Sequence, residues 1–108
     1  MDPRIQLVVS TIEREFSNKL STETLGHLVN MSASRLRHLF KAETGLTVSQ
    51  YLKQIRMRRA EVLLQTTFLS VKQIMNLVGV HDDAYFSREF RKLYGAAPGQ
   101  YRKLFDRE

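Results

Sequence analysis

Apolar and polar positions between residues 47 and 66 follow the period of an α-helix, but they form two apolar stripes. At about 100° per residue, one arc of the helical wheel collects six side chains: Val48, Tyr51, Leu52, Ile55, Val62 and Leu63. Met57, Ala60 and Leu64 form a second arc on the other side of Arg56. A helix that lies on one core needs one stripe. The pattern therefore predicts a spacer helix that serves two small units.

The start of this segment carries the signals of a helix boundary. Thr47 and Gln50 have the spacing of a capping box, in which two side chains and two backbone amides bond reciprocally. Gly45 suits the left-handed residue that ends a preceding helix. These residues predict a spacer helix over about 47–66 with a separate helix before it.

The first 46 residues predict three shorter helices. The first, over about residues 3–16, is indicated by apolar side chains at helical spacing: Ile5, Val8, Val9, Ile12 and Phe16. Asp2 is its expected N-cap, because Pro3 suits a first helical turn. Ser21 caps the second helix, whose expected buried side chains are Leu25, Leu28 and Val29. Gly26 inside this helix either allows a close helix approach or only weakens the element.

A tight turn separates this second helix from a third, which Ser32 caps. Its apolar face consists of Leu36, Leu39 and Phe40. The rest of its surface is polar and basic. Two short helices joined by a tight turn, with a basic second helix, are the sequence form of a helix-turn-helix. By itself this is a weak signal, because many helical hairpins look alike.

The second half of the chain repeats the pattern. Ser70-x-x-x-Ile74-x-x-Leu77-Val78 repeats Ser21-x-x-x-Leu25-x-x-Leu28-Val29 after 49 positions. Further pairs are 50 positions apart: Leu36 and Phe86, Phe40 and Phe90, Lys41 and Arg91, Gly45 and Gly95, Gln50 and Gln100, Tyr51 and Tyr101. The repeat raises the helix-turn-helix interpretation well above a chance resemblance.

The repeat also predicts the elements of the second half. Ser70 and Gln73 form a further capping box, and Asp82 or Asp83 caps the next helix. That helix is expected to carry inward Tyr85, Phe86, Phe90 and Leu93. Pro98 opens a final helix over about 98–106. We therefore predict an all-α chain of about seven helices, with helix-turn-helix lobes of about 1–46 and 67–108 joined by the spacer.

The charge of the chain favours an anionic binding partner. The formal net charge is +6, and residues 32–66 hold seven basic side chains against two acidic ones. This balance suits nucleic acid or an anionic membrane surface, although a solvated basic face is the simpler interpretation of the segment alone. The absence of cysteine excludes disulfides and thiolate metal sites, and it fits a reducing cytoplasm. No apolar run reaches the length of a membrane span.

An enzyme is not expected. His27, His38 and His81 share no metal-ligand spacing, and the sequence has no glycine-rich phosphate loop and no nucleophile–base set. We expect no metal and no cofactor. The better rival to DNA binding is a helical module that binds another protein, but such a module more often exposes an apolar groove where this chain has a doubled basic helix.

Three motifs carry a family resemblance. The first two are Ser32-x-x-x-Leu36-x-x-x-Phe40-Lys41-x-x-x-Gly45 and Tyr51-Leu52-x-x-x-Arg56-x-x-x-Ala60-x-x-x-Leu64. The third and most specific is Gly79-x-x-Asp82-x-x-Tyr85-Phe86-Ser87-Arg88-x-Phe90-Arg91-x-x-x-Gly95-x-x-Pro98-x-x-Tyr101-Arg102. With these motifs, residues from about 20 to 102 resemble the DNA-binding domain of the AraC/XylS family of bacterial transcription regulators. Residues 1–19 resemble the family's usual first helix.

Five positions depart from the family pattern. Gly26 and Met75 replace small residues, usually alanine, and Val80 replaces a frequent phenylalanine. Ala84 replaces a frequent serine at the start of the second reading helix. Ala97 replaces the threonine that would cap the last helix, which predicts a weaker cap.

The resemblance implies sequence-specific binding to double-stranded DNA, with the helices of about 33–44 and 83–94 in successive major grooves. The positions that match the family's base-reading residues are Ser34, Arg37, His38, Asp83, Ala84, Tyr85, Ser87 and Arg88. Contacts to the DNA backbone are implied for Arg35, Lys41, Arg91 and Lys92. Asp83 also fits a helix N-cap. Arg56 and Arg59 either pair with a carboxylate such as Glu61 or meet DNA.

The resemblance also implies a biological role. Family members regulate transcription, more often as activators, through contact with RNA polymerase in the bacterial cytoplasm. They usually carry a separate effector-sensing or dimerisation domain. We expect such a domain to be missing from this chain, which leaves an excised domain and a short stand-alone regulator as alternatives.

Overall fold

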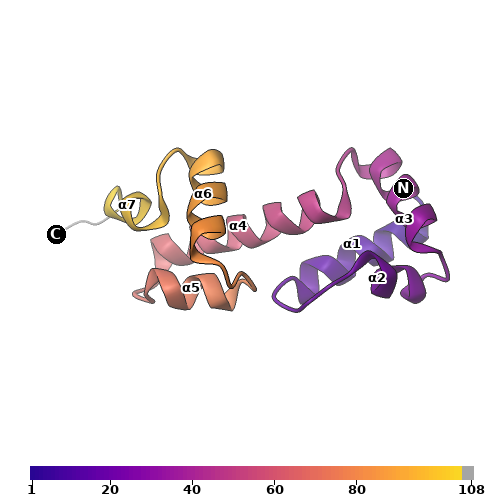
Figure 1. Cartoon of the computed structure of the whole chain (residues 1–108), viewed down its shortest axis with the longest axis horizontal. Helices are drawn as coiled ribbons and strands as arrows, with labels where there is room; N and C mark the ends of the chain where they lie inside the picture. The colour runs from indigo at the N-terminus through magenta and orange to yellow at the C-terminus, as the bar shows by residue number, and fades with distance from the viewer. Residues whose placement is uncertain (106–108) are drawn as a thin grey trace. The chain divides into compact units, whose positions relative to one another are not determined.

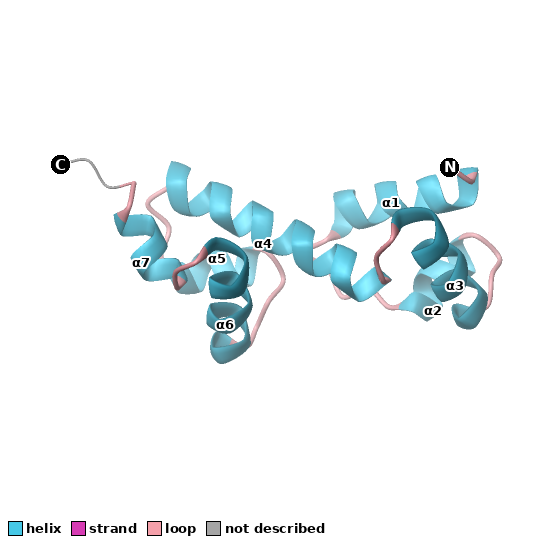
Figure 2. Ribbon diagram, turned by 90° about the horizontal axis from the view of Figure 1, so that it is seen from above, coloured by secondary structure: helices cyan, strands magenta, loops and turns pink. Residues whose placement is uncertain are grey.

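The computed structural model describes residues 1–105, and within that range the chain is all-helical. Figure 1 shows the helices in chain order, and Figure 2 shows loops but no strand between them. Seven helices lie in the described range: α1 Pro3–Glu15, α2 Thr22–Leu28, α3 Ala33–Thr44, α4 Val48–Thr66, α5 Val71–Leu77, α6 Asp83–Tyr94 and α7 Pro98–Lys103. The predicted all-α class is confirmed. Position 106, the expected end of the last helix, lies outside the described residues.

The chain divides into two compact units, Met1–Ile55 and Arg56–Glu108. The division falls inside α4, so the first part of this helix belongs to unit 1 and the second part to unit 2. This division of α4 between two units explains why the spacer helix has two apolar arcs. The four residues of the wide arc up to Ile55 contribute to the core of unit 1, and the narrow arc of Met57, Ala60 and Leu64 is buried in unit 2.

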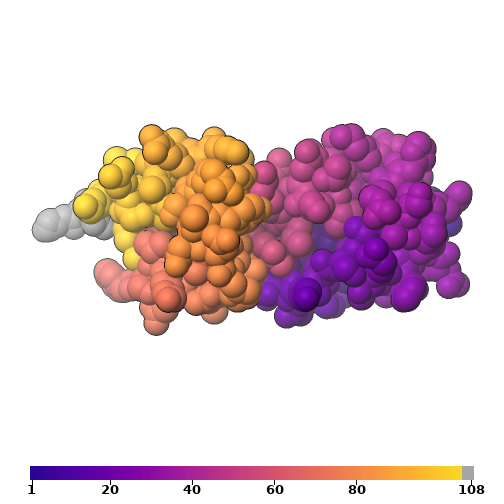
Figure 3. Space-filling view, viewed as in Figure 1, coloured from indigo at the N-terminus to yellow at the C-terminus, as the bar shows by residue number. Residues whose placement is uncertain are grey.

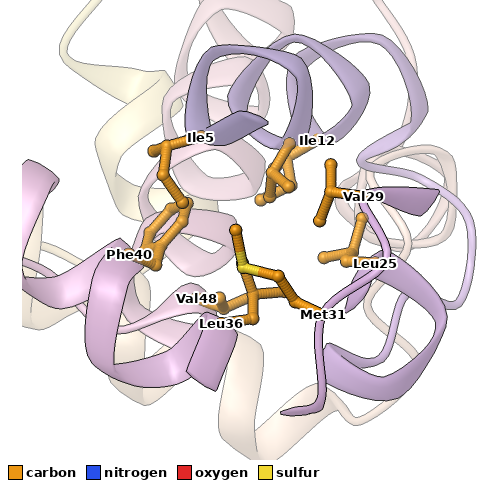
Figure 4. Packing of buried hydrophobic residues seen from close by; sticks show 9 residues of the cluster. Ile5, Ile12, Leu25, Val29, Met31, Leu36, Phe40 and Val48 are labelled. Atoms are coloured by element: carbon orange, nitrogen blue, oxygen red, sulfur yellow. The ribbon is translucent and has the colours of Figure 1, made fainter. Parts of the chain in front are cut away.

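Unit 1 packs α1, α2, α3 and the start of α4 around one core (Figure 4). Its buried side chains are Ile5, Val8, Ile12, Leu25, Val29, Met31, Leu36, Phe40 and Val48. Tyr51, Leu52 and Ile55, from the wide arc of α4, pack against this core and are partly buried. Burying an aliphatic or aromatic side chain of this size stabilises a fold by about 1.5–3 kcal/mol. The core therefore fixes which face of α3 remains in water.

Unit 2 is built in the same way, with the second part of α4 in the place of α1. Met57, Ala60 and Leu64 are buried, and their spacing repeats that of Ile5, Val8 and Ile12 in α1. The core of the unit continues through the aromatic rings of Phe86, Phe90 and Tyr101. Helix α4, which the sequence predicts as a spacer, is thus also the first core helix of the second repeat.

Most of the predicted helix boundaries are confirmed by hydrogen bonds. Backbone amides donate to the capping side chains of Asp2, Ser21, Ser32 and Ser70, and Asp82 is the cap of α6. The capping boxes of Thr47 with Gln50 and of Ser70 with Gln73 are both present. The glycines at positions 45, 79 and 95 have positive φ. Ala97 supplies no side-chain bond to α7, as its departure from the family pattern predicts.

Three expected core positions are wrong. Leu28 is 49% exposed, Leu93 45% and Val62 40%. Leu28 is the last residue of α2, and the next residue, Val29, takes the buried place. Val62 lies in the part of α4 that belongs to unit 2, although the helical wheel groups it with residues that serve unit 1. Spacing places a residue on a helix face but does not say whether a neighbour covers that face.

Gly26 allows a close approach, but not of the kind expected. A Cβ atom at this position would lie 2.5 Å from the carbonyl oxygen of Met31. The backbone amide of Met31 in turn donates to the carbonyl of Gly26 over 2.8 Å. The glycine therefore accommodates the turn between α2 and α3, where Asn30 has φ 59°, and not a second helix.

Arg102 fastens α7 to the loop after α4. Its guanidinium donates to the carbonyl oxygens of Leu64, Thr67 and Leu69 at 3.2, 3.2 and 2.5 Å. One charged side chain thereby satisfies a carbonyl in the last turn of α4 and two in the following loop, and such hydrogen bonds are stronger than neutral ones. The motif arginine after Tyr101 thus has a structural role in unit 2.

Candidate nucleic-acid interface

The outer face of α3 collects the residues that the sequence predicts as DNA-reading. Leu36 and Phe40 are buried on one side of this helix. The 3.6-residue period then places Ser34, Arg37 and His38 away from the core, and all three are exposed. The core of unit 1 therefore presents the predicted reading side chains to the outside.

These side chains line one surface hollow. Its walls are Ser34, Arg37, His38, Lys41, Ala42, Thr47 and Val48. Thr47 and Val48 stand at the beginning of α4, so the hollow lies between the reading helix and the N-terminus of the next one. Arg35 is exposed but does not line the hollow. A basic hollow beside a helix N-terminus suits phosphate, because backbone amides there point outward.

A second hollow occupies the corresponding place on unit 2. It is lined by Ala84, Ser87, Arg88, Arg91, Lys92 and Ala97. Each of these residues lies 50 positions after a residue that lines the first hollow. Figure 3 shows the orange atoms of α6 at the surface of the molecule. The duplication in the sequence therefore extends to the predicted reading surface, although the hollow on α6 is richer in basic side chains.

Two predicted reading residues of α6 lie outside this hollow. Asp82, not Asp83, is the N-cap, since its carboxylate accepts from the amide of Tyr85 at 2.9 Å. Asp83 is exposed in the first turn. Tyr85 is half-buried, and the guanidinium of Arg88 lies over its ring at 5.9 Å from the centroid. Both residues border the reading surface without lining it.

The structure adds Glu89, which sequence reasoning missed. This glutamate is 8% exposed although it stands on the basic reading helix. Its Oε2 atom is 3.4 Å from Nε of Arg88 and 3.3 Å from Nζ of Lys92. One signal was available: the corresponding residue of α3 is Leu39, so a carboxylate takes an apolar position of the repeat.

Comparison with known proteins decides the family. A model of the family described as a helix-turn-helix domain matches residues 25–104. The chain belongs to the AraC/XylS family. An HTH-type transcriptional activator RhaR from Salmonella schwarzengrund is 34% identical over 104 residues, which cover 96% of this chain and 36% of that protein. The chain spans just over a third of the length of the curated relatives it matches.

Solved structures agree with this assignment. The C-terminal domain of AraT, a response regulator from Geobacillus stearothermophilus, has a TM-score of 0.92 and 31% identity, and the match covers 99% of this chain and 89% of that one. The DNA-binding domain of AdpA, a global transcriptional factor solved with a target DNA, has a TM-score of 0.89 and 25% identity over 94% and 92% of the two chains. The chain is thus a helix-turn-helix DNA-binding domain of the AraC/XylS type.

Arg56 of this AraC/XylS domain has a shifted pKa because it is partly buried. Burial lowers the pKa of Arg56, and the nearby Tyr85 acts in the opposite direction. Arginine nevertheless stays protonated, because its ordinary pKa is above 12. Glu61, the carboxylate considered as a partner for Arg56 or Arg59, accepts a hydrogen bond from the hydroxyl of Tyr101. Arg56 is thus a partly buried arginine of unit 2.

Other kinds of site find no support in the described residues. Between residues 1 and 105 no group of three or more histidine, cysteine, aspartate or glutamate side chains is placed to hold a metal ion. Nor is any described helix both long enough and apolar enough to cross a membrane.

Proposed function

We propose that α3 and α6 are two recognition helices that enter successive major grooves of one DNA duplex. The observation that carries this proposal is the pair of corresponding hollows, one on α3 and one on α6, whose lining residues lie at equivalent positions and include the basic pair Lys41 and Arg91. Successive grooves on one face are about 34 Å apart. The 19-residue α4 is roughly 28 Å long at 1.5 Å per residue, which suits a spacer of this kind.

Within each hollow we assign two kinds of contact. Arg37 and Arg88 have the chemistry for bidentate bonds to O6 and N7 of guanine. Ser34, His38 and Ser87 are further base-reading candidates, and Ala84 offers only an apolar contact, which suits a thymine methyl group. Lys41, Arg91, Lys92 and Arg35 are assigned to phosphates, which position the helix without reading sequence.

For the biological role, we propose a transcription activator that contacts RNA polymerase in the cytoplasm, and not an enzyme. The similarity to a relative named as a transcriptional activator supports this role. We also propose that an effector-sensing or dimerisation domain acts together with this DNA-binding domain, since the relatives are nearly three times as long as the matched segment.

Selection of bound sites from random duplex DNA tests the proposal. The selected site should contain two base-pair clusters about one helical turn apart, and footprinting should protect both. Arg37→Ala should cost ~1–3 kcal/mol on this site and relax the preference at one base pair. Lys41→Ala, the matched control on the same helix, should weaken binding to all sequences alike. A selected motif that is unchanged by Arg37→Ala would remove that residue from base reading.

The same selection experiment distinguishes DNA binding from the alternative function, a helical module that binds another protein. A protein-docking module should show weak, non-selective retention on duplex DNA and should yield no enriched motif. Enrichment of a single cluster would support DNA binding by one helix and contradict the two-groove proposal.

A further inference from the structure

Arg88 is held from two sides in α6. Its Nε atom donates to Oε2 of Glu89 at 3.4 Å, and its guanidinium lies over the ring of Tyr85. Within residues 1–105 its Nη1 and Nη2 atoms have no hydrogen-bond partner, and the side chain is 58% exposed. Nη1 and Nη2 form one of the donor pairs of a guanidinium that can make a bidentate contact with guanine.

Glu89 is suited to such a hold because it is shielded from water. Its side chain is only 10% exposed, whereas those of its partners Arg88 and Lys92 are mostly exposed. Ion pairs gain strength as the local dielectric falls, so this carboxylate acts more strongly than a solvated one. To move Arg88 or Lys92 towards a phosphate would take a cation away from a largely buried negative charge.

The other reading helix has no equivalent. Leu39 stands where α6 has Glu89, His38 where it has Arg88, and Ala42 where it has Lys92. Arg37 has no ion pair among the described residues of unit 1. The two reading helices therefore share a scaffold but differ in how their basic side chains are restrained.

We infer that Glu89 is a specificity-determining positioning residue of the DNA interface. Together with the ring of Tyr85 it holds Nε of Arg88, which leaves Nη1 and Nη2 for a guanine. By pairing with Lys92 it weakens the attraction of α6 for phosphates of any sequence. This inference rests on the proposed reading role of α6. Its energetic basis is pre-organisation: a side chain already held in position loses less conformational freedom on binding.

Removal of the carboxylate should have two effects of opposite sign. Lys92 and Arg88 become free to contact phosphates, so affinity for arbitrary duplex DNA rises. The guanidinium of Arg88 is no longer held in position, so discrimination at the base pair that it contacts falls. A residue with a purely structural role would lower binding to every sequence together and would leave discrimination unchanged.

The experiment compares Glu89→Leu and Glu89→Gln with the unaltered chain. Leucine is the residue at the corresponding place of α3, and glutamine keeps the shape of the side chain without its charge. Affinity is measured for the selected site, for that site with the Arg88 guanine replaced, and for random duplex, over a series of salt concentrations. Discrimination at the guanine should fall about tenfold. The magnitude of the salt slope on random duplex should rise by about 1, the value for roughly one added phosphate contact.

Glu15→Gln is the control for charge. Arg14 and Glu15 form a neighbouring pair at the same 3.4 Å separation, but on the exposed surface of α1. This variant removes one negative charge and should leave discrimination unchanged. Thermal unfolding monitored by circular dichroism shows whether each variant is folded.

Each outcome has a definite meaning. Folded Glu89 variants with unchanged discrimination and unchanged salt slope would overturn the inference, as would an equal loss on all three duplexes. An unaltered chain that selects no site would overturn the proposed function, and the inference with it. A tenfold loss that also appears in Glu15→Gln would assign the effect to net charge and overturn the role of Glu89.

Discussion

The hydroxyl of Tyr101 shows how one residue links the elements of unit 2. It donates to the carboxylate of Glu61 and accepts from the side-chain amide of Gln65 at 3.2 Å, so it connects α7 to α4. Burial raises the pKa of Tyr101 above its ordinary value, and the hydrogen bond to Glu61 adds to this shift. The folded chain therefore favours the neutral phenol.

This shift predicts a loss of stability in alkali. A raised pKa in the folded state means that the contribution of Tyr101 is complete below its ordinary pKa of about 10. The contribution then falls as pH rises through the higher folded pKa, because folding opposes ionisation. Urea unfolding between pH 7 and 11 should show a decline that Tyr101→Phe reduces. At pH 7 the same substitution should cost about 1 kcal/mol through the lost hydrogen bonds. A decline of unchanged size in this variant would assign it to other groups, such as Tyr94.

Substitution by alanine should have opposite effects on stability at two glycines, Gly26 and Gly99. In Gly26→Ala the added Cβ would meet the backbone oxygen of Met31 at 2.5 Å, so the turn between α2 and α3 must shift. The expected cost, about 1–3 kcal/mol, exceeds the gain of roughly 1 kcal/mol in helix propensity. Gly99→Ala in α7 is the matched control, because a Cβ there meets nothing within 4 Å. It should be neutral or stabilising. Chemical denaturation of both variants checks the signs, and a stabilised Gly26→Ala would contradict the packing of that turn.

At the scale of elements, α4 is the part of the chain on which both cores depend. Ile55 packs against the core of unit 1, and Leu64 is buried in unit 2. Substitution of Leu64 by alanine should cost ~2–5 kcal/mol through lost burial and the cavity that remains. Ile55 is only partly buried, so its substitution should cost less. Chemical denaturation of the two variants measures both costs, and a larger loss at Ile55 would contradict this order.

An insertion in α4 tests its role as a spacer. Two alanines added after Arg58 keep the helical sequence but rotate the rest of the helix by ~200° and move it by ~3 Å. They also cut across both apolar arcs, so some loss of stability is expected. In molecules that stay helical, affinity for a full site should fall towards that of one reading helix, while salt-sensitive non-specific binding remains. Footprinting the variant on the selected site is the measurement. Protection of both half-sites at unchanged affinity would show that α4 is not a rigid spacer.

At the scale of the whole molecule, the net charge of +6 predicts a strong dependence of DNA binding on salt. If roughly six to eight phosphates are neutralised, log K against log salt should have a slope of about −5 to −7. Titration of the selected duplex at several salt concentrations measures it. A slope near −1 on a good site would be incompatible with contact in two grooves.

Local physics explains which features could be predicted from the sequence. A capping bond joins residues three positions apart, and a left-handed residue needs glycine at its own position, so Ser32, Ser70 and Gly45 could be assigned without a fold. The same holds for the seven helices and for the repeat. The exposed face of α3 could be predicted as well, because Leu36 and Phe40 leave only one side for its basic residues.

Contacts between residues that are distant in the sequence could be identified only from the tertiary structure. Leu28 and Leu93 have the spacing of core residues, yet they are exposed because no neighbouring element covers them. Gly26 was expected to meet a helix, but the atom against it is a turn carbonyl. The pairing of Glu89 with Arg88 and Lys92 depends on the burial of a carboxylate, which only the surrounding side chains determine. Sequence periodicity thus determined the elements and the residues that share each face, whereas packing decided which faces meet water and which charges meet each other.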